Sequence, residues 1–273
     1  MNDTAYRIPI LDHACNAGSH AAIAVNRLDA RADETLVRFT DYGIACDDYA
    51  GRSSIAGQRI AGATAEVWGR RTVAEKVSRA GARLRAKGVE LFVLDAYRPI
   101  QCQEGLWRFF CDQAREHMAD ATEEERKNYV LTLVSDPTRF SPADSTTWPV
   151  HACGGAVDVA LRSLETGERL LLDWDSPLNE TARSDAFERK ALAGEIEADY
   201  ACLVNRRMLH WAMEQEGFIN YPAEFWHFDY GDQMYVLNAQ KLGLPDAPQA
   251  AWYGYVDVPK EEKTQVKSSW ETK

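Results

Sequence analysis

The spacing of apolar and polar residues changes several times along the chain, and each change predicts a new element. Between residues 61 and 87 apolar side chains recur every three to four positions among arginines and glutamates, which predicts a helix that stops at Gly88. The run VELFVLD at 89–95 is nearly all apolar and predicts a buried strand. A second helix is expected over 101–118, because Pro99 suits the first turn of a helix.

The second half of the chain repeats this mixture of short strands and single helices. The alternating run VDVAL predicts a strand at 157–161, and ETGE predicts a hairpin turn at 165–168. A helix is expected over 199–216, ending at Gly217, and a strand rich in aromatic residues over 225–230.

Two stretches show little periodicity. Residues 1–60 carry short apolar pieces between Gly and Asp, and we expect mostly loop with short strands there. Residues 119–149 carry a charged run followed by Ser, Thr, Asp and Pro, which predicts a short solvated helix and then a loop.

These elements predict an α+β fold. Strands in adjacent hairpins alternate with separate helices, and no regular strand–helix–strand repeat is present, which favours a single domain with a central, mostly antiparallel sheet flanked by helices. The domain is expected to span residues 1–258. The polar segment 259–273 is expected to be a disordered tail.

Composition narrows the class of partner. The chain has 273 residues, of which 45% are hydrophobic and 27% charged, as in ordinary globular proteins. The formal net charge of -11 argues against binding to nucleic acid or to an anionic membrane, because both depend on Lys and Arg. The six cysteines form no CxxC pair, and neither a secretory signal nor an apolar run of membrane-spanning length is visible, so we expect a cytoplasmic protein with free thiols.

The candidate chemistry begins with the run HACGGAVD at 151–158. Asp158 lies in an otherwise apolar strand, where an ionised carboxylate needs a cation or hydrogen-bond donors. His151 precedes it by an odd number of residues, which would place it on the opposite face of a straight strand. Gly154 and Gly155 permit a turn that returns His151 toward Asp158. The alternative is a buried Asp that caps a loop, beside a histidine that only makes hydrogen bonds.

A second motif, EFWH at 224–227, supplies the remaining groups. The expected strand carries His227, and Pro222 sets a turn that carries Glu224. Two imidazoles and one carboxylate suit a zinc ion, one per chain, with a fourth position for water beside Glu224. The prediction fails if the Asp158 and His227 side chains lie more than about 8 Å apart, because zinc–ligand distances are about 2 Å. The alternative is an aromatic core strand with an exposed Glu.

Arg98 ends the strand predicted at 89–95. A guanidinium beside a metal site can polarise a carbonyl and bind the oxyanion that develops from it. The alternative is an arginine that pairs with surface carboxylates.

Together, HxxGGAxD, ExWH and DAYRP resemble the motifs of the zinc D-alanyl-D-alanine dipeptidases, the VanX-like branch of the M15 metallopeptidases. The resemblance covers the chain from about Leu36 to Tyr235. It implies a zinc ion held by His151, Asp158 and His227. It also implies that Glu224 is the general base and that Arg98 stabilises the tetrahedral intermediate.

The same resemblance implies a hedgehog/DD-peptidase-like α+β fold with its cleft over an antiparallel sheet. The implied reaction is hydrolysis of a small dipeptide such as D-Ala-D-Ala, with a place in cell-wall metabolism. Family members commonly have Ser two residues before the first ligand, whereas this chain has Pro149. The family also uses an acidic residue to hold the substrate amine, for which Asp175 is the best match and Asp173 the competitor.

Three other functions stay open at the sequence level. The first is a carboxypeptidase or endopeptidase that acts on peptidoglycan stem peptides. The second is a non-haem iron oxygenase, which also uses two histidines and a carboxylate but has no need for Glu224. The third is a non-catalytic zinc-bearing domain of the same fold that binds a partner.

Overall fold

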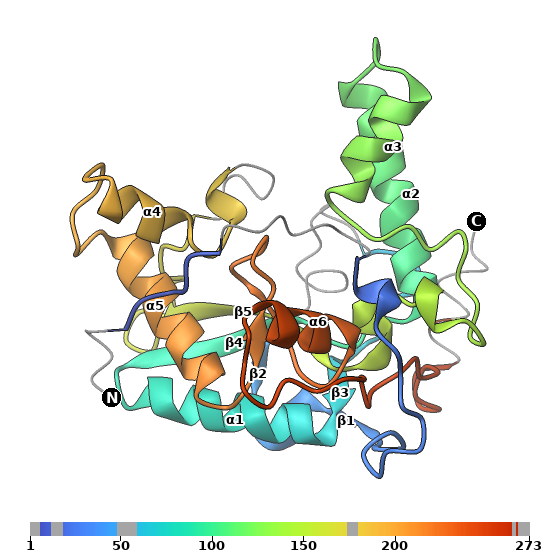
Figure 1. Cartoon of the computed structure of the whole chain (residues 1–273), viewed down its shortest axis with the longest axis horizontal. Helices are drawn as coiled ribbons and strands as arrows, with labels where there is room; N and C mark the ends of the chain where they lie inside the picture. Colours follow the sequence, from blue (N-terminus) through green and yellow to red (C-terminus); the bar gives the residue numbers. More distant parts are fainter. Residues whose placement is uncertain (1–5, 12–18, 48–58, 174–179, 264–265, 267–273) are drawn as a thin grey trace.

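The computed structural model of the protein describes residues 6–11, 19–47, 59–173, 180–263 and 266 (Figure 1). In these residues the helices are α1 (Arg71–Arg85), α2 (Ile100–His117), α3 (Glu123–Leu131), α4 (Ala186–Leu192), α5 (Ala201–Glu214) and α6 (Gln233–Lys241). The strands are β1 (Leu36–Arg38), β2 (Ala45–Cys46), β3 (Trp68–Arg70), β4 (Val89–Asp95), β5 (Ala156–Ser163), β6 (Ile219–Asn220) and β7 (His227–Asp229).

The main sheet of the described residues has five strands in the order β2-β4-β5-β7-β6. All neighbours are antiparallel except β2, which runs parallel to β4. β1 and β3 form a separate antiparallel pair. The predicted α+β class with a mostly antiparallel central sheet is therefore confirmed.

The two faces of the sheet differ in character, and this difference positions the site. On β5, Val157, Val159 and Leu161 point to one face and are fully buried, whereas Asp158 points to the other. β4 has a register shift between Val93 and Asp95, where an extra residue brings Asp95 opposite Asp158. One face is thus apolar, and the other carries a row of polar side chains.

Helices α1 and α5 pack against the apolar core. Val73, Val77 and Leu84 recur along one side of α1 and are fully buried in a cluster that includes the apolar side chains of β4 and β5. Figure 1 shows α1 beside β4, and one end of α5 lies against α1. α2 and α3 pair and project from the rest of the molecule, around a smaller cluster that includes Leu106 and Val130.

Two predicted elements begin later than the sequence suggests. The helix predicted from residue 61 begins at Arg71, because residues 68–70 pair with β1 as strand β3. The final strand begins at His227 and not at Phe225, because Phe225 and Trp226 still belong to the turn. The strand at 89–95 and the helices near 101–118 and 199–216 are present, within a few residues of their predicted ends.

The predicted disordered tail needs a correction where the structure describes it. Glu262 is buried, and its carboxylate accepts hydrogen bonds from the Ala65 amide (2.9 Å) and the Trp68 indole (3.2 Å). Val266 is also buried. This part of 259–273 is therefore packed onto the domain, because a buried carboxylate and an apolar side chain both gain from the contact.

No helix in the described part of the chain has both the length and the apolar composition needed to cross a bilayer.

Candidate active site

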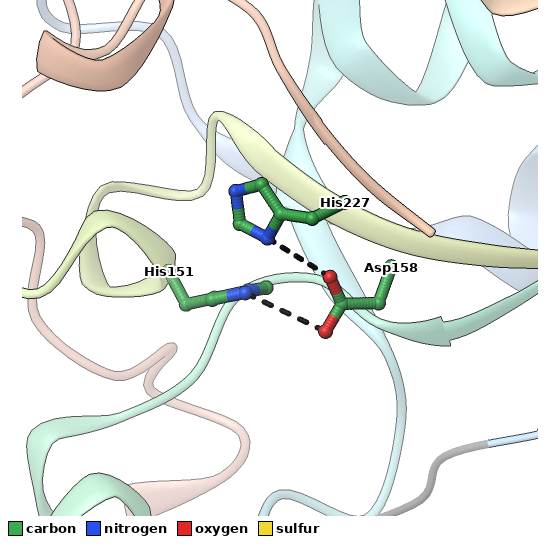
Figure 2. A group of neighbouring side chains, drawn as sticks. All are labelled: His151, Asp158 and His227. Carbon is green, nitrogen blue, oxygen red and sulfur yellow. Dashed lines mark hydrogen bonds and ion pairs between the residues drawn. The ribbon is translucent and has the colours of Figure 1, made fainter. Parts of the chain in front are cut away.

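Three side chains from different parts of the chain meet on the polar face of the sheet. One ligand atom from each of His151, Asp158 and His227 lies within 4.8 Å of the others (Figure 2). The Nδ1 atom of His227 is 3.0 Å from Asp158 Oδ1, and the Nε2 atom of His151 is 3.6 Å from Asp158 Oδ2. Asp158 and His227 are thus well inside the 8 Å limit. Among the described residues, no other cluster of His, Cys, Asp or Glu meets these criteria for a metal site.

Strand register and a glycine turn produce this convergence. Asp158 on β5 is directly paired with His227 on β7, so their side chains share a face of the sheet. His151 lies in a 3₁₀ turn, η5 (Val150–Cys153), just before β5. Gly154 follows with a φ of 74°, a left-handed conformation that favours glycine and that turns the chain back toward Asp158.

Each histidine has one ring nitrogen anchored and the other directed at Asp158. His151 Nδ1 lies 2.7 Å from the Ala96 carbonyl, and His227 Nε2 lies 2.9 Å from Asp229 Oδ1. Metal-binding histidines are commonly oriented in this way by an acceptor on the second nitrogen. Two imidazole nitrogens and one carboxylate, with ligand atoms within 4.8 Å of one another, are donors that zinc accepts in proteins. The donor set therefore fits a zinc ion.

The two histidines have opposite protonation tendencies. Burial lowers the pKa of His151 to about 3, so this ring is neutral at pH 7 and ready to donate a lone pair. Burial also opposes a charge on His227, but the carboxylates of Asp229 and Asp158 outweigh burial and raise its pKa well above the usual value.

Glu224 lies at the open side of the cluster, in a turn closed by the hydrogen bond from its amide to the Tyr221 carbonyl (2.9 Å). Its Oε2 atom is 3.9 Å from His227 Nδ1. Its side chain is 29% exposed, compared with 5% for His227 and 10% for Asp158, so solvent reaches the site beside Glu224. Burial by the surrounding protein raises the pKa of Glu224 to about 7, with His227 opposing the shift. A carboxylate with such a pKa can accept a proton near neutral pH.

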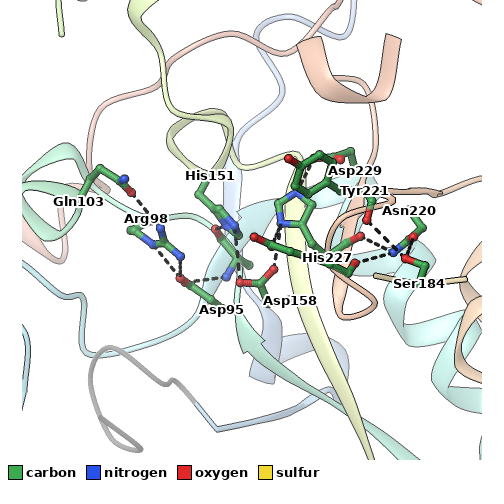
Figure 3. Close-up of polar contacts among 12 residues, drawn as sticks. Asp95, Arg98, Gln103, His151, Asp158, Ser184, Asn220, Tyr221, His227 and Asp229 are labelled. Carbon is green, nitrogen blue, oxygen red and sulfur yellow. Dashed lines mark hydrogen bonds and ion pairs between the residues drawn. The ribbon is translucent and has the colours of Figure 1, made fainter. Parts of the chain in front are cut away.

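Arg98 is buried at the end of β4 and is held by two neighbours. Its Nε and Nη2 atoms donate to Asp95 Oδ2 (2.8 and 2.6 Å), and its Nη1 atom donates to Gln103 Oε1 (2.8 Å). Figure 3 shows Asp95 between Arg98 and Asp158. The predicted alternative of a surface ion pair is wrong, because the partner carboxylate is buried. The positive charge of Arg98 helps to lower the pKa of both His151 and Glu224, so its field reaches the site.

The sequence did not assign a role to three polar residues that support the site. Asp229 orients His227, and Asp95 and Gln103 orient Arg98. Asp229 carried a usable signal, since residues two apart on a strand share a face. Gln103 carried none, because it comes from the following helix and only the fold brings it to Arg98.

The turn that carries His151 is held from outside by a buried arginine. Arg70 donates from its amide to the Gly154 carbonyl (3.0 Å) and from Nε to the Cys153 carbonyl (2.8 Å). Its Nη2 atom donates to the Gly254 carbonyl (3.0 Å), which links the turn to the C-terminal segment.

The C-terminal segment contacts the His151 turn and Tyr97, the residue that precedes Arg98, through Val256. The Val256 amide donates to the Ala152 carbonyl (3.2 Å), beside His151. The Val256 carbonyl accepts a hydrogen bond from the hydroxyl of Tyr97 (3.0 Å), beside Arg98. One residue of this segment therefore joins the stretches that carry His151 and Arg98.

The sequence offers two candidates for binding the substrate amine, Asp175 and Asp173. Asp175 lies outside the described residues. Asp173 is half-buried and has a φ of 62°, a left-handed conformation that is uncommon for a residue other than glycine.

Known proteins resemble this chain over most of its length. The sequence profile of the peptidase M15 family, described as D-Ala-D-Ala dipeptidase, matches residues 37–243. A D-alanyl-D-alanine dipeptidase of Synechocystis sp. is 27% identical over 192 residues, which cover 62% of this chain and 70% of that protein.

Two solved structures show weaker similarity. One is a mutant of the vancomycin-resistance D,D-pentapeptidase VanY in complex with Zn(II), with a TM-score of 0.41 and 16% identity over 77% of this chain and 88% of that one. The other is VanYB in complex with D-alanine-D-alanine, with a TM-score of 0.44 and 17% identity over 81% and 92%.

The profile match contains the whole cluster, from Arg98 through His151 and Asp158 to Glu224 and His227. Since it also spans well over half of the chain, the protein belongs to the M15 family of D-Ala-D-Ala dipeptidases and is a metallopeptidase.

Proposed function

We propose that the protein is a zinc-dependent dipeptidase that hydrolyses D-Ala-D-Ala or a closely related small dipeptide. The observation that supports this most is the convergence of His151, Asp158 and His227 within 4.8 Å, with Glu224 at 3.9 Å from His227 on the side open to solvent. Three protein ligands and an accessible fourth side are typical of catalytic zinc, whereas structural zinc has four protein ligands.

The proposed roles follow from the charge and position of each group. A zinc ion held by His151, Asp158 and His227 would polarise the scissile carbonyl and lower the pKa of water. Glu224, with a pKa near 7, takes the proton of the attacking water and delivers it to the leaving amine. Arg98 stabilises the negative charge on the carbonyl oxygen as it develops.

The choice of substrate rests on the family and on the Synechocystis relative, whose name specifies D-Ala-D-Ala. Pro149 stands where the family pattern has Ser, so the contacts that orient the dipeptide differ in this chain. Hydrolysis of a D,D-dipeptide would place the protein in cell-wall metabolism, and the cytoplasmic location expected from the sequence is part of the same proposal.

The decisive experiment combines a metal analysis with a substrate panel. We expect about one zinc ion per chain and faster release of alanine from D-Ala-D-Ala than from L,D- and L,L-dipeptides. Faster release from a stem pentapeptide would favour a carboxypeptidase instead. Iron together with oxygen consumption would favour an oxygenase, and full zinc occupancy without cleavage of any dipeptide would favour a non-catalytic domain.

A further inference from the structure

Another buried arginine, Arg206 on α5, makes contacts that the proposed reaction does not explain. Its side chain is among the largest that are fully buried, with 1% of the residue exposed. Its Nε and Nη2 atoms both donate to the Leu172 carbonyl (2.9 and 2.6 Å). Its Nη1 atom donates to the carbonyls of Thr181 (2.7 Å) and Arg183 (3.0 Å). The guanidinium therefore joins two stretches of main chain about ten residues apart.

Burying a guanidinium among carbonyl groups is costly unless its donors are satisfied. Burial lowers the pKa of Arg206 to about 10, which still leaves the group charged at pH 7. The planar fork of arginine directs its donors to acceptors that lie apart from one another, whereas the three donors of a lysine ammonium all come from one compact nitrogen. Such an arrangement is typical of a residue that fixes the path of the main chain.

The main chain held by Arg206 is attached directly to the Glu224 turn. The Phe225 amide donates to the Ala182 carbonyl (2.9 Å), and the Ser184 amide donates to the Pro222 carbonyl (3.1 Å). These two hydrogen bonds lie on either side of Glu224. In addition, the guanidinium carbon of Arg206 lies 3.7 Å from the centre of the Phe225 ring.

Arg206 also binds the main chain next to Asp173. Leu172, whose carbonyl accepts two bonds from Arg206, directly precedes this residue. Asp173 has the left-handed φ of 62°, which persists only where the surrounding structure holds it. Arg206 and Asp173 also attract each other electrostatically.

We propose that Arg206 is a positioning residue that fixes the Glu224 turn and the Leu172–Asp173 main chain in a single arrangement. The general base and a candidate for binding the substrate amine are then held at a constant separation. This inference rests on the proposed function, because it assigns Arg206 a part in dipeptide hydrolysis although it touches neither substrate nor metal.

The adjacent residue provides a matched control. Arg207 is also buried on α5, but its guanidinium pairs with the carboxylate of Glu188 at 2.6 and 2.7 Å. A lysine at position 207 can keep one ion pair with Glu188. A lysine at position 206 cannot reproduce the hydrogen bonds to all three carbonyls. Arg206→Lys and Arg207→Lys therefore make the same chemical change at neighbouring sites with different partners.

The experiment measures zinc content, kcat, KM and amide hydrogen exchange for the zinc-loaded wild type and both variants. For Arg206→Lys we expect one zinc per chain, as in the wild type, and a fall in kcat/KM of about 10–100-fold, because small displacements of catalytic groups have effects of this size. Exchange at the Phe225 and Ser184 amides should rise at least about tenfold in the same variant. Arg207→Lys should change none of these quantities.

A second variant covers the case in which Arg206→Lys does not fold. Phe225→Leu keeps an apolar side chain but removes the ring that the guanidinium contacts, and a smaller fall in kcat/KM at constant zinc content is expected. Wild-type kcat/KM and exchange in Arg206→Lys would overturn the proposal, and so would equal changes in Arg207→Lys. If the wild type cleaves no dipeptide but exchange still rises only in Arg206→Lys, the proposed function fails and the positioning role stands.

Discussion

The candidate site is built from two kinds of structure. Asp158 and His227 lie on adjacent strands in direct register, whereas His151 and Glu224 lie in turns at the ends of those strands. The strand pair is positioned by the hydrogen-bond ladder of the sheet itself. The turns have no ladder, and their positions depend on contacts with other parts of the chain.

These contacts come from buried arginines that bind main-chain carbonyls. Arg70 holds the His151 turn through the Cys153 and Gly254 carbonyls, and Arg206 holds the main chain attached to the Glu224 turn. We therefore expect Asp158 and His227, which the hydrogen-bond ladder positions, to keep their places when neighbouring residues are substituted. His151 and Glu224, which lie in turns, form the half of the site that is more sensitive to such substitutions. Substitutions in the two halves should therefore have different consequences.

The largest effect is expected from Glu224→Gln, which removes the proposed base from the turn and leaves the proposed ligands on the strands intact. We expect kcat to fall about 10³–10⁵-fold, equivalent to about 4–7 kcal/mol of barrier, with zinc content unchanged. Steady-state kinetics and metal analysis on the same preparation check this. An active Glu224→Gln enzyme would remove Glu224 from the mechanism.

Gly155→Ala should disturb the turn that carries His151. A Cβ atom at Gly155 would lie 2.6 Å from the Tyr230 carbonyl oxygen and 2.9 Å from Asp232 Oδ2, so the main chain must move. We expect the free energy of unfolding to fall by about 1–3 kcal/mol, with weaker zinc binding.

The matched control is Gly81→Ala in α1. Nothing lies within 4 Å of a Cβ at that position, so the change should stabilise the protein by about 0.4–1 kcal/mol. Denaturant unfolding measures both variants. Equal stability for Gly155→Ala and the wild type would show that the His151 turn tolerates movement and is not the more sensitive half of the site.

Asp229→Asn tests whether His227, on strand β7, also needs a side-chain contact to stay in position. The side-chain amide of asparagine is neutral, so it lacks the negative charge with which Asp229 binds the Nε2 atom of His227. We expect zinc affinity to fall about 10–100-fold, as for other residues that orient metal ligands. Competition with a chelator measures the affinity, and an unchanged value would mean that the ladder alone positions His227.

The last prediction concerns the dependence of zinc binding on pH. The raised pKa of His227 means that its proton is still bound at pH 6, so zinc must displace it, and affinity should fall as the pH is lowered. His151, with a pKa of about 3, should release no proton in this range. We expect a loss of about tenfold in affinity per pH unit between pH 7 and 5. Calorimetry in buffers of different ionisation enthalpy counts the protons, and release of none at pH 6 would contradict the prediction.

The sequence predicted the long elements and the convergence of the cluster well. The strand at 89–95 follows from its apolar run, and Gly154–Gly155 indicated the turn that brings His151 to Asp158. The two-residue strand β6 and helices α4 and α6 were missed, because short or mixed patterns give weak periodic signals.

The supporting residues were harder to predict for a different reason. Arg70 and Arg206 bind carbonyl oxygens, which every residue possesses, so no residue type in the sequence identifies their partners. The same applies to the anchoring of His151 by the Ala96 carbonyl. Such contacts depend on the path of the main chain and become visible only in the folded protein.

The position of Val256 has a practical consequence for protein engineering. The match to the family profile ends at residue 243, yet Val256 joins the segments that carry His151 and Arg98. A chimera that exchanged catalytic cores between relatives at the profile boundary would inherit a foreign partner for both segments. Grafts designed on this scaffold should therefore carry residues 252–262 along with the core.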